Sequence, residues 1–150
     1  LLEILREEAF FTRPFPKTTG PEMFSLDWVK NAITQLPKGS PNPYDVMATL
    51  TRLSAETIAE AIGRVGIQGK GQVFVSGGGA HNPLMMQFLR ELLPAFKIQP
   101  MKKIGIDGDA KEAVLFAVLA NETVAGSVSD ENFQLGGVPL VSMGKISLPG

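Results

Sequence analysis

The order of apolar and polar positions along the chain predicts helices alternating with short strands. Apolar residues at helical spacing predict a long helix over residues 46–63, with Asp45 as its N-cap. The run Gln72–Ser76 is short, rich in branched side chains and bounded by glycines, which predicts a buried strand. The other predicted elements are a short helix over residues 1–9, a loop over 10–25, a helix over Leu26–Leu36, a helix from Asn82-Pro83 to about Leu93, a short strand over Phe96–Gln99, a loop over Lys102–Gly108 and a helix from Asp109 to about Val124.

The last of these helices is apolar on nearly every side through Ala113–Ala120, so we expect it to be buried. Strands that alternate with helices favour an α/β fold with an at least partly parallel sheet. The chain offers only two or three convincing strands, and a parallel sheet needs both faces covered and more strands than that. We therefore expect the sheet to be completed by chain outside these 150 residues. The stretch Phe133–Gly150 has only short apolar runs between glycines.

The most informative stretch is the glycine run that follows the predicted strand. Gly77, Gly78 and Gly79 come directly after it, and Asn82-Pro83 then begins a helix. Asn caps a helix well, and Pro at the first helical position gives up an N–H group that has no partner anyway. Glycines let a ligand approach the backbone, and the next helix is expected to offer unpaired N–H groups to a phosphate. A tight turn with no ligand explains the same pattern, and no dinucleotide or Walker motif is present.

A second candidate region is acidic and lies where a loop meets a helix. Asp107, Asp109 and Glu112 fall within six residues. On spacing alone, Asp109 and Glu112 form a capping box. The alternative is that Glu112 faces a cleft and accepts hydrogen bonds from substrate hydroxyls. Two weaker candidates are His81 and Lys17. His81, beside the glycines, either touches a nucleotide or is a solvated turn residue. Lys17 and the Thr18-Thr19-Gly20 that follow it either contact a phosphate or sugar or simply make a turn.

Composition narrows the function further. The 14 basic and 15 acidic residues argue against a nucleic-acid partner. The absence of cysteine and the single histidine exclude thiolate and multi-histidine metal sites. No apolar run reaches the roughly 18 residues that span a bilayer, and no signal peptide is visible, so we expect a cytoplasmic protein without a membrane partner. The chain does not begin with Met, which favours a longer parent protein.

Four motifs occur together in the order known from one family. They are the segments over residues 16–24, 45–51, 76–85 and 105–113, including Pro16-Lys17-Thr18-Thr19-Gly20, Ser76-Gly77-Gly78-Gly79-Ala80-His81-Asn82-Pro83 and Gly105-Ile106-Asp107-Gly108-Asp109-Ala110-Lys111-Glu112. Over about residues 5–148 the chain resembles the C-terminal part of the anhydro-N-acetylmuramic acid kinases. Each motif alone is weak, but the four in order are specific.

The resemblance implies an α/β fold of the actin, hexokinase and Hsp70 ATPase type, with a ribonuclease H-like lobe whose mixed sheet has flanking helices. Residues 1–150 would be most of the C-terminal lobe of a two-lobed sugar kinase without its N-terminal lobe, and the piece alone is expected to be inactive. The implied reaction uses ATP and Mg²⁺ to open a 1,6-anhydro ring and phosphorylate O6, giving N-acetylmuramic acid 6-phosphate. Levoglucosan kinase and a non-catalytic nucleotide- or sugar-binding module are the alternatives, and a homodimer is compatible with all three.

The resemblance also assigns roles to residues. Gly77, Gly78 and Gly79 would hold ATP, with Asn82 as the cap of the adjoining helix, and Glu112 would bind the anhydrosugar. The catalytic aspartate and the first phosphate-binding loop are expected upstream, so this chain is assigned neither a catalytic residue nor a metal ligand. One departure concerns the sugar: Pro21 stands where bacterial members usually have Arg, which removes a cation able to grip a carboxylate.

Overall fold

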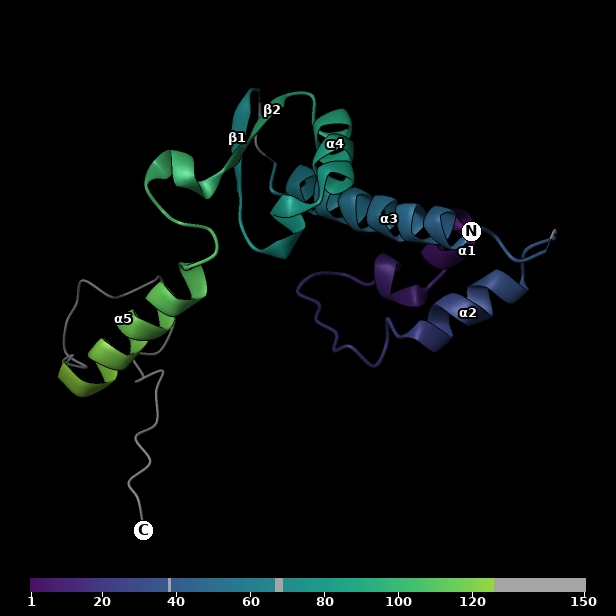
Figure 1. Ribbon diagram of the computed structural model, residues 1–150, viewed down its shortest axis with the longest axis horizontal. Coiled ribbons are helices and arrows are strands. Elements are labelled where there is room, and N and C mark those ends of the chain that lie inside the picture. Colours follow the sequence, from purple (N-terminus) through teal and green to yellow (C-terminus); the bar gives the residue numbers. More distant parts are fainter. Residues whose placement is uncertain (38, 67–68, 126–150) are drawn as a thin grey trace, which may run out of the picture. The chain divides into compact units, whose positions relative to one another are not determined.

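The computed structural model describes residues 1–37, 39–66 and 69–125. The chain divides into two compact units, Leu1–Gln99 and Pro100–Gly150. The elements of the first unit, seen in Figure 1, are α1 (Leu2–Arg6), η1 (Ala9–Thr12), α2 (Leu26–Thr34), α3 (Pro43–Arg64), β1 (Gly71–Val75), η2 (Gly78–His81), α4 (Pro83–Leu92) and β2 (Phe96–Pro100), where η denotes a 3-10 helix.

Helix α3 is the centre of the first unit, because two of its faces carry separate cores. Leu53 and Ala55 are both buried, and since successive residues turn by about 100° around a helix axis, they point to nearly opposite sides. Ala55 packs in a cluster with α4 and the strands. Leu53 packs in a second cluster with residues of α1 and α2. Figure 1 shows the same division, with α4 and the strands on one side of α3 and α1 and α2 on the other.

The sheet has two strands within the described residues, β1 beside β2. The backbone N–H of Gly71, the first residue of β1, donates to the carbonyl of Ala95, the residue before β2, at 3.2 Å. The strands therefore start side by side and run parallel, with α4 as the crossover between them. This confirms the predicted strand–glycine loop–helix–strand order and the α/β class.

Two helices of the first unit begin with the same pair of residues. Asn82 and Asn42 are both N-caps, and each is followed by proline at the first helical position. The Asn42 carboxamide oxygen accepts the N–H of Tyr44 at 2.9 Å. The prediction that Asp45 caps α3 is therefore wrong, because the helix begins one turn earlier, where Asn supplies the acceptor and proline has no N–H to leave unpaired.

The second unit contains η3 (Met101–Ile104) and α5 (Lys111–Ala125) among its described residues. The prediction that this apolar helix is buried is wrong: Val114, Leu115, Phe116, Val118 and Val124 are between 45% and 77% exposed. Between residues 100 and 125 the structure describes no further helix or strand able to form a covering layer. An apolar sequence favours burial but does not supply the partner. The stretch Phe133–Gly150 lies outside the described residues.

Candidate functional site

The three glycines that follow β1 form a turn rather than a direct strand-to-helix join. Gly77 has φ of 80° and ψ of 179° and precedes the short helix η2. The N–H of Ala80 donates to the carbonyl of Gly77 at 3.0 Å, and the N–H of Asn82 donates to that of Gly79 at 3.2 Å. The positive φ of Gly77 suits glycine, because a Cβ is strained in that conformation. We call Gly77–Gly79 the glycine turn.

The glycine turn is open to approach. All three residues are exposed, and a Cβ added to any of them would meet no atom within 4 Å. The first N–H groups of a helix have no partner within that helix, and in η2 these belong to Gly78 and Gly79. Bare amides with free space in front of them are suited to receive phosphate or carboxylate oxygens.

The start of α4 does not offer the unpaired N–H groups that the sequence led us to expect. Pro83 has none, and the Asn82 carboxamide oxygen accepts those of Leu84 and Met85 at 3.0 and 3.1 Å. The carbonyl of Asn82 accepts the N–H of Met86 at 3.1 Å. The expectation is wrong because the side chain that caps the helix already accepts the N–H groups that were expected to be unpaired. Asn82 thus acts as the predicted cap, and the available amides are those of the glycine turn.

Glu112 lies in the second unit, so the structure describes it apart from the glycine turn. It is exposed in the first turn of α5, which begins at Lys111. The predicted capping box of Asp109 and Glu112 is wrong by one residue, because Asp109 precedes the helix by two positions. The local geometry explains the later start: the Asp107 carboxylate accepts the N–H of Asp109 at 3.0 Å, which forms a turn there. The sugar-binding role of Glu112 stays a prediction.

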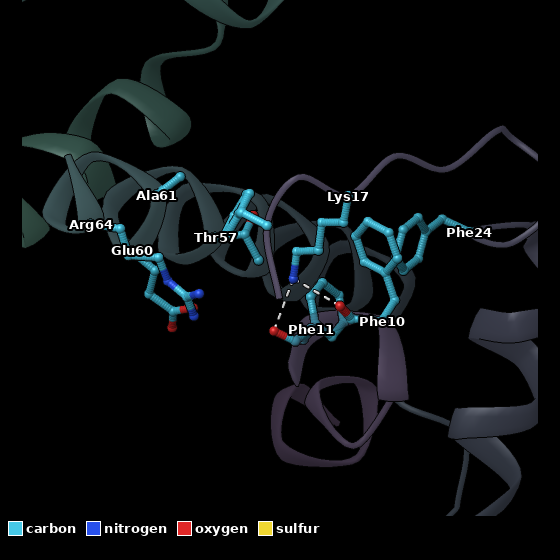
Figure 2. Close-up of a pocket in the computed structure, with 9 residues that line it drawn as sticks. Phe10, Phe11, Lys17, Phe24, Thr57, Glu60, Ala61 and Arg64 are labelled. Atoms are coloured by element: carbon cyan, nitrogen blue, oxygen red, sulfur yellow. Dashed lines mark hydrogen bonds between the residues drawn. The ribbon is translucent and has the colours of Figure 1, made fainter. Parts of the chain in front are cut away.

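Lys17 is held inside its own unit, a role that sequence reasoning missed. Its Nζ donates to the carbonyls of Phe10 and Phe11 at 2.8 and 3.0 Å (Figure 2), and it stands over the rings of Phe10 and Phe15 at 4.7 and 5.1 Å. The other weak candidate, His81, is exposed at the end of η2. The four nearby phenylalanines were the available signal for Lys17, since a cation is attracted to aromatic faces.

The loop that follows Lys17 is closed by its own side chain. The carboxylate of Glu22 accepts the N–H of Gly20 at 3.2 Å, and the N–H of Met23 donates to the carbonyl of Gly20 at 3.4 Å.

Across residues 1–37, 39–66 and 69–125, no group of three or more His, Cys, Asp or Glu side chains is placed to hold a metal ion. In the same ranges, no helix is both long and apolar enough to cross a membrane.

A parallel strand, an open glycine turn and a capped helix together define an α/β unit with exposed backbone amides after its first strand. Comparison with known proteins narrows this class. The family model for anhydro-N-acetylmuramic acid kinase matches residues 1–148, and the chain belongs to that family.

Curated relatives agree with the family model. Proteins named anhydro-N-acetylmuramic acid kinase are 48% identical in Pseudoalteromonas atlantica, 44% in Pseudoalteromonas translucida and 39% in Vibrio cholerae. The alignments cover 99%, 98% and 99% of this chain, and 38%, 37% and 40% of the respective relatives. The chain thus spans about two fifths of the length of the relatives that it matches.

Proposed function

We propose that the full-length protein is a kinase that uses ATP to phosphorylate 1,6-anhydro-N-acetylmuramic acid. Membership of the family over residues 1–148 carries this proposal. In the proposed reaction, water opens the 1,6-anhydro ring and O6 receives the phosphoryl group, giving N-acetylmuramic acid 6-phosphate and ADP. The relatives are named for the muramic sugar, which supports this sugar over levoglucosan as the substrate. We place the reaction in the cytoplasm.

In this proposal the chain is most of the C-terminal lobe of a two-lobed enzyme with an actin-type fold. The glycine turn receives phosphate oxygens of ATP on the N–H groups of Gly78 and Gly79, and Asn82 fixes the helix that follows. Support comes from the open space at all three glycines. Such a site has no side chain to desolvate, and its donors are already fixed in place by η2.

Mg²⁺ belongs to the proposal because kinases neutralise phosphate charge with it. The described residues contain no carboxylate cluster suited to the ion, so we assign it no ligand in this chain. The family resemblance places the catalytic aspartate upstream, so we assign no catalytic base here, and the proposed role of this lobe is to bind and orient the nucleotide and the sugar.

The nucleotide role is tested by Gly78→Ala in the full-length protein. The added Cβ meets no neighbour and Gly78 does not have positive φ, so the fold should tolerate it while the methyl occupies the ligand's approach. We expect affinity for a non-hydrolysable ATP analogue to fall about tenfold, or roughly 1.4 kcal/mol, measured by isothermal titration. Gly77→Ala is a poor test, because φ of 80° strains any other residue.

The matched control is Gly63→Ala, on α3. A Cβ there also meets nothing within 4 Å, and nucleotide affinity should not change. Equal affinity of Gly78→Ala and wild type would contradict the role of the glycine turn without touching the family assignment. Titration of 1,6-anhydro-N-acetylmuramic acid and levoglucosan with the ATP analogue present tests the substrate. If neither sugar binds, the kinase proposal fails, and the result supports the alternative of a non-catalytic binding module.

The sugar role is tested by Glu112→Gln. If Glu112 accepts hydrogen bonds from sugar hydroxyls, loss of its charge should lower kcat/KM about 10- to 100-fold, because a hydrogen bond to a charged group contributes about 1.5–3 kcal/mol. The melting temperature should hardly move, since the side chain is exposed. Glu122→Gln, exposed on the same helix, is the control. A lower melting temperature with unchanged kinetics would instead assign Glu112 to helix stabilisation.

A further inference from the structure

A pocket lies in the first unit, apart from the residues assigned above to ATP and sugar. Its volume is about 170 Å³, which compares with the roughly 150 Å³ cavity that takes up one benzene molecule. Four phenylalanines line it, together with a stretch of α3. We call it the phenylalanine pocket; Figure 2 shows the loop residues on one side and the α3 residues on the other. The phenylalanines are Phe10, Phe11, Phe15 and Phe24.

The aromatic wall is fixed by its own ring contacts. Phe10 and Phe24 meet edge to face at 5.4 Å, and Phe11 stacks on Phe24 at 5.5 Å. Phe24 in turn meets Trp28 edge to face at 5.0 Å. Offset-stacked and edge-to-face pairs at these distances stabilise one another, so the wall offers ring faces and edges in a set arrangement. A flat apolar ligand is the shape that such a wall accommodates.

Charge in the pocket is positive. The ammonium of Lys17 uses two of its three N–H donors on backbone carbonyls, which leaves one for a ligand. The guanidinium of Arg64 lies over the ring of Phe15 at 5.0 Å. The acidic lining residue, Glu60, is already paired with Arg6 of α1. Over the part of the chain that the structure describes, neither Lys17 nor Arg64 forms an ion pair.

We propose that the phenylalanine pocket binds a small planar organic anion, one ring in size, that carries a carboxylate or phosphate. The ring packs against the phenylalanines, and the anionic group accepts hydrogen bonds from Lys17 and Arg64. A cation of the same shape is repelled by both charges, and a neutral ring loses the charged contacts. The inference rests on the pocket alone and stands or falls separately from the kinase proposal.

The test uses four probes that share one ring and differ in charge: benzoate, phenyl phosphate, benzyl alcohol and benzylamine. Binding to the full-length protein is followed by saturation-transfer NMR and by isothermal titration, with the ATP analogue and the sugar present. We expect benzoate or phenyl phosphate to bind at least about tenfold more tightly than the alcohol, and the amine to give no signal. The ratio of the affinities for benzoate and phenyl phosphate tells whether the pocket is suited to a carboxylate or a phosphate.

Arg64→Gln identifies the pocket as the site, because Arg64 is exposed and its removal should not disturb the fold. Anion affinity should fall about fivefold, while Arg90→Gln, an exposed cation on α4, should leave it unchanged. Phe15→Leu, at a ring that is 53% exposed, should weaken all ring-bearing probes. The proposal is overturned if neither anion binds, if alcohol and anion bind equally, if Arg64→Gln has no effect, or if the ATP analogue displaces the probes.

Discussion

The glycine turn and the phenylalanine pocket are two proposed binding sites in one small unit, and they are built in different ways. The glycine turn is made of backbone from consecutive residues and has almost no side chains. The phenylalanine pocket is made of side chains that come from residues 10–24 and from residues 57–64 of α3. The first depends on local conformation and the second on the contact of two distant segments. They should therefore respond to different mutations, which the following predictions use.

The largest loss of stability is expected from Lys17→Met, which removes the hydrogen bonds from Lys17 to the carbonyls of Phe10 and Phe11. The variant loses two hydrogen bonds from a charged donor and two contacts with aromatic rings. We expect unfolding free energy to fall by about 2 kcal/mol, measured by urea unfolding of the full-length protein. Nucleotide affinity at the glycine turn should not change.

Lys30→Met is the control for that variant. Lys30 is exposed and lies 3.6 Å from Asp27 in an ordinary surface pair, so its loss should cost no more than about 0.5 kcal/mol. If the two lysine variants are equally stable, the hydrogen bonds of Lys17 do not stabilise the loop.

A smaller effect is expected from Asn82→Ala, which acts on the glycine-turn side. The carboxamide oxygen of Asn82 caps two N–H groups of α4, so its loss should cost about 1–2 kcal/mol of unfolding free energy. Nucleotide affinity should fall too, because the side-chain cap fixes Asn82, and the backbone N–H of Asn82 donates to the Gly79 carbonyl of the glycine turn. Benzoate affinity at the phenylalanine pocket should stay the same.

Asn42→Ala provides the comparison for that variant. Asn42 caps one N–H of α3 in the same Asn-Pro context, so its loss should cost less, about 1 kcal/mol, with no change in nucleotide affinity. Equal nucleotide losses in both variants would show that Asn82 acts through overall stability and not through the turn.

The sequence allowed accurate prediction where the signal is local. The strand, the glycine turn and the helix from Asn82-Pro83 lie where they are predicted, because each depends on neighbouring residues. The prediction that the strand is buried is wrong, since β1 is at most half-buried and, within the described residues, lies beside a single strand. The identical Asn42-Pro43 pair precedes α3, but the predicted cap is Asp45, so the sequence contains a signal that the prediction does not use. The donors of α4 were misjudged for a different reason, since a good cap satisfies the same groups that would bind an anion.

Other features could not be predicted because they depend on tertiary contacts. The apolar pattern of α5 indicated a preference for burial, but no local signal says which element covers a helix. The approach of α3 to the loop that holds Lys17 depends on residues some 40 positions apart in the sequence. The family resemblance supplied roles for Gly77–Gly79 and Glu112, but it gave no indication of the phenylalanine pocket.

The smallest effect on stability is expected from Arg6→Gln, and it separates the two sites. Arg6 pairs with Glu56 at 3.0 Å and with Glu60. Its pKa is raised above the ordinary value, chiefly by the hydrogen bond with Glu60, against an opposing effect of burial and with the charges of Glu60 and Glu56 adding to the rise. A cation whose pKa is raised by folding stabilises the folded state fully at pH values below its ordinary pKa. This stabilisation is lost only when the pH rises through the raised pKa that the group has in the folded protein.

The stability difference between wild type and Arg6→Gln should therefore be constant between about pH 6 and pH 9, far below the ordinary arginine pKa. It should stay under about 1 kcal/mol, as for other half-exposed pairs, and shrink with added salt. The same substitution leaves Glu60 of the phenylalanine pocket without its partner, so benzoate should bind more weakly while the ATP analogue binds as before. Thermal unfolding across this pH range and the two titrations measure all three effects. A stability difference that varies with pH would show that Arg6 is not the group responsible. Unchanged benzoate affinity would show that the charge of Glu60 does not affect a ligand in the pocket.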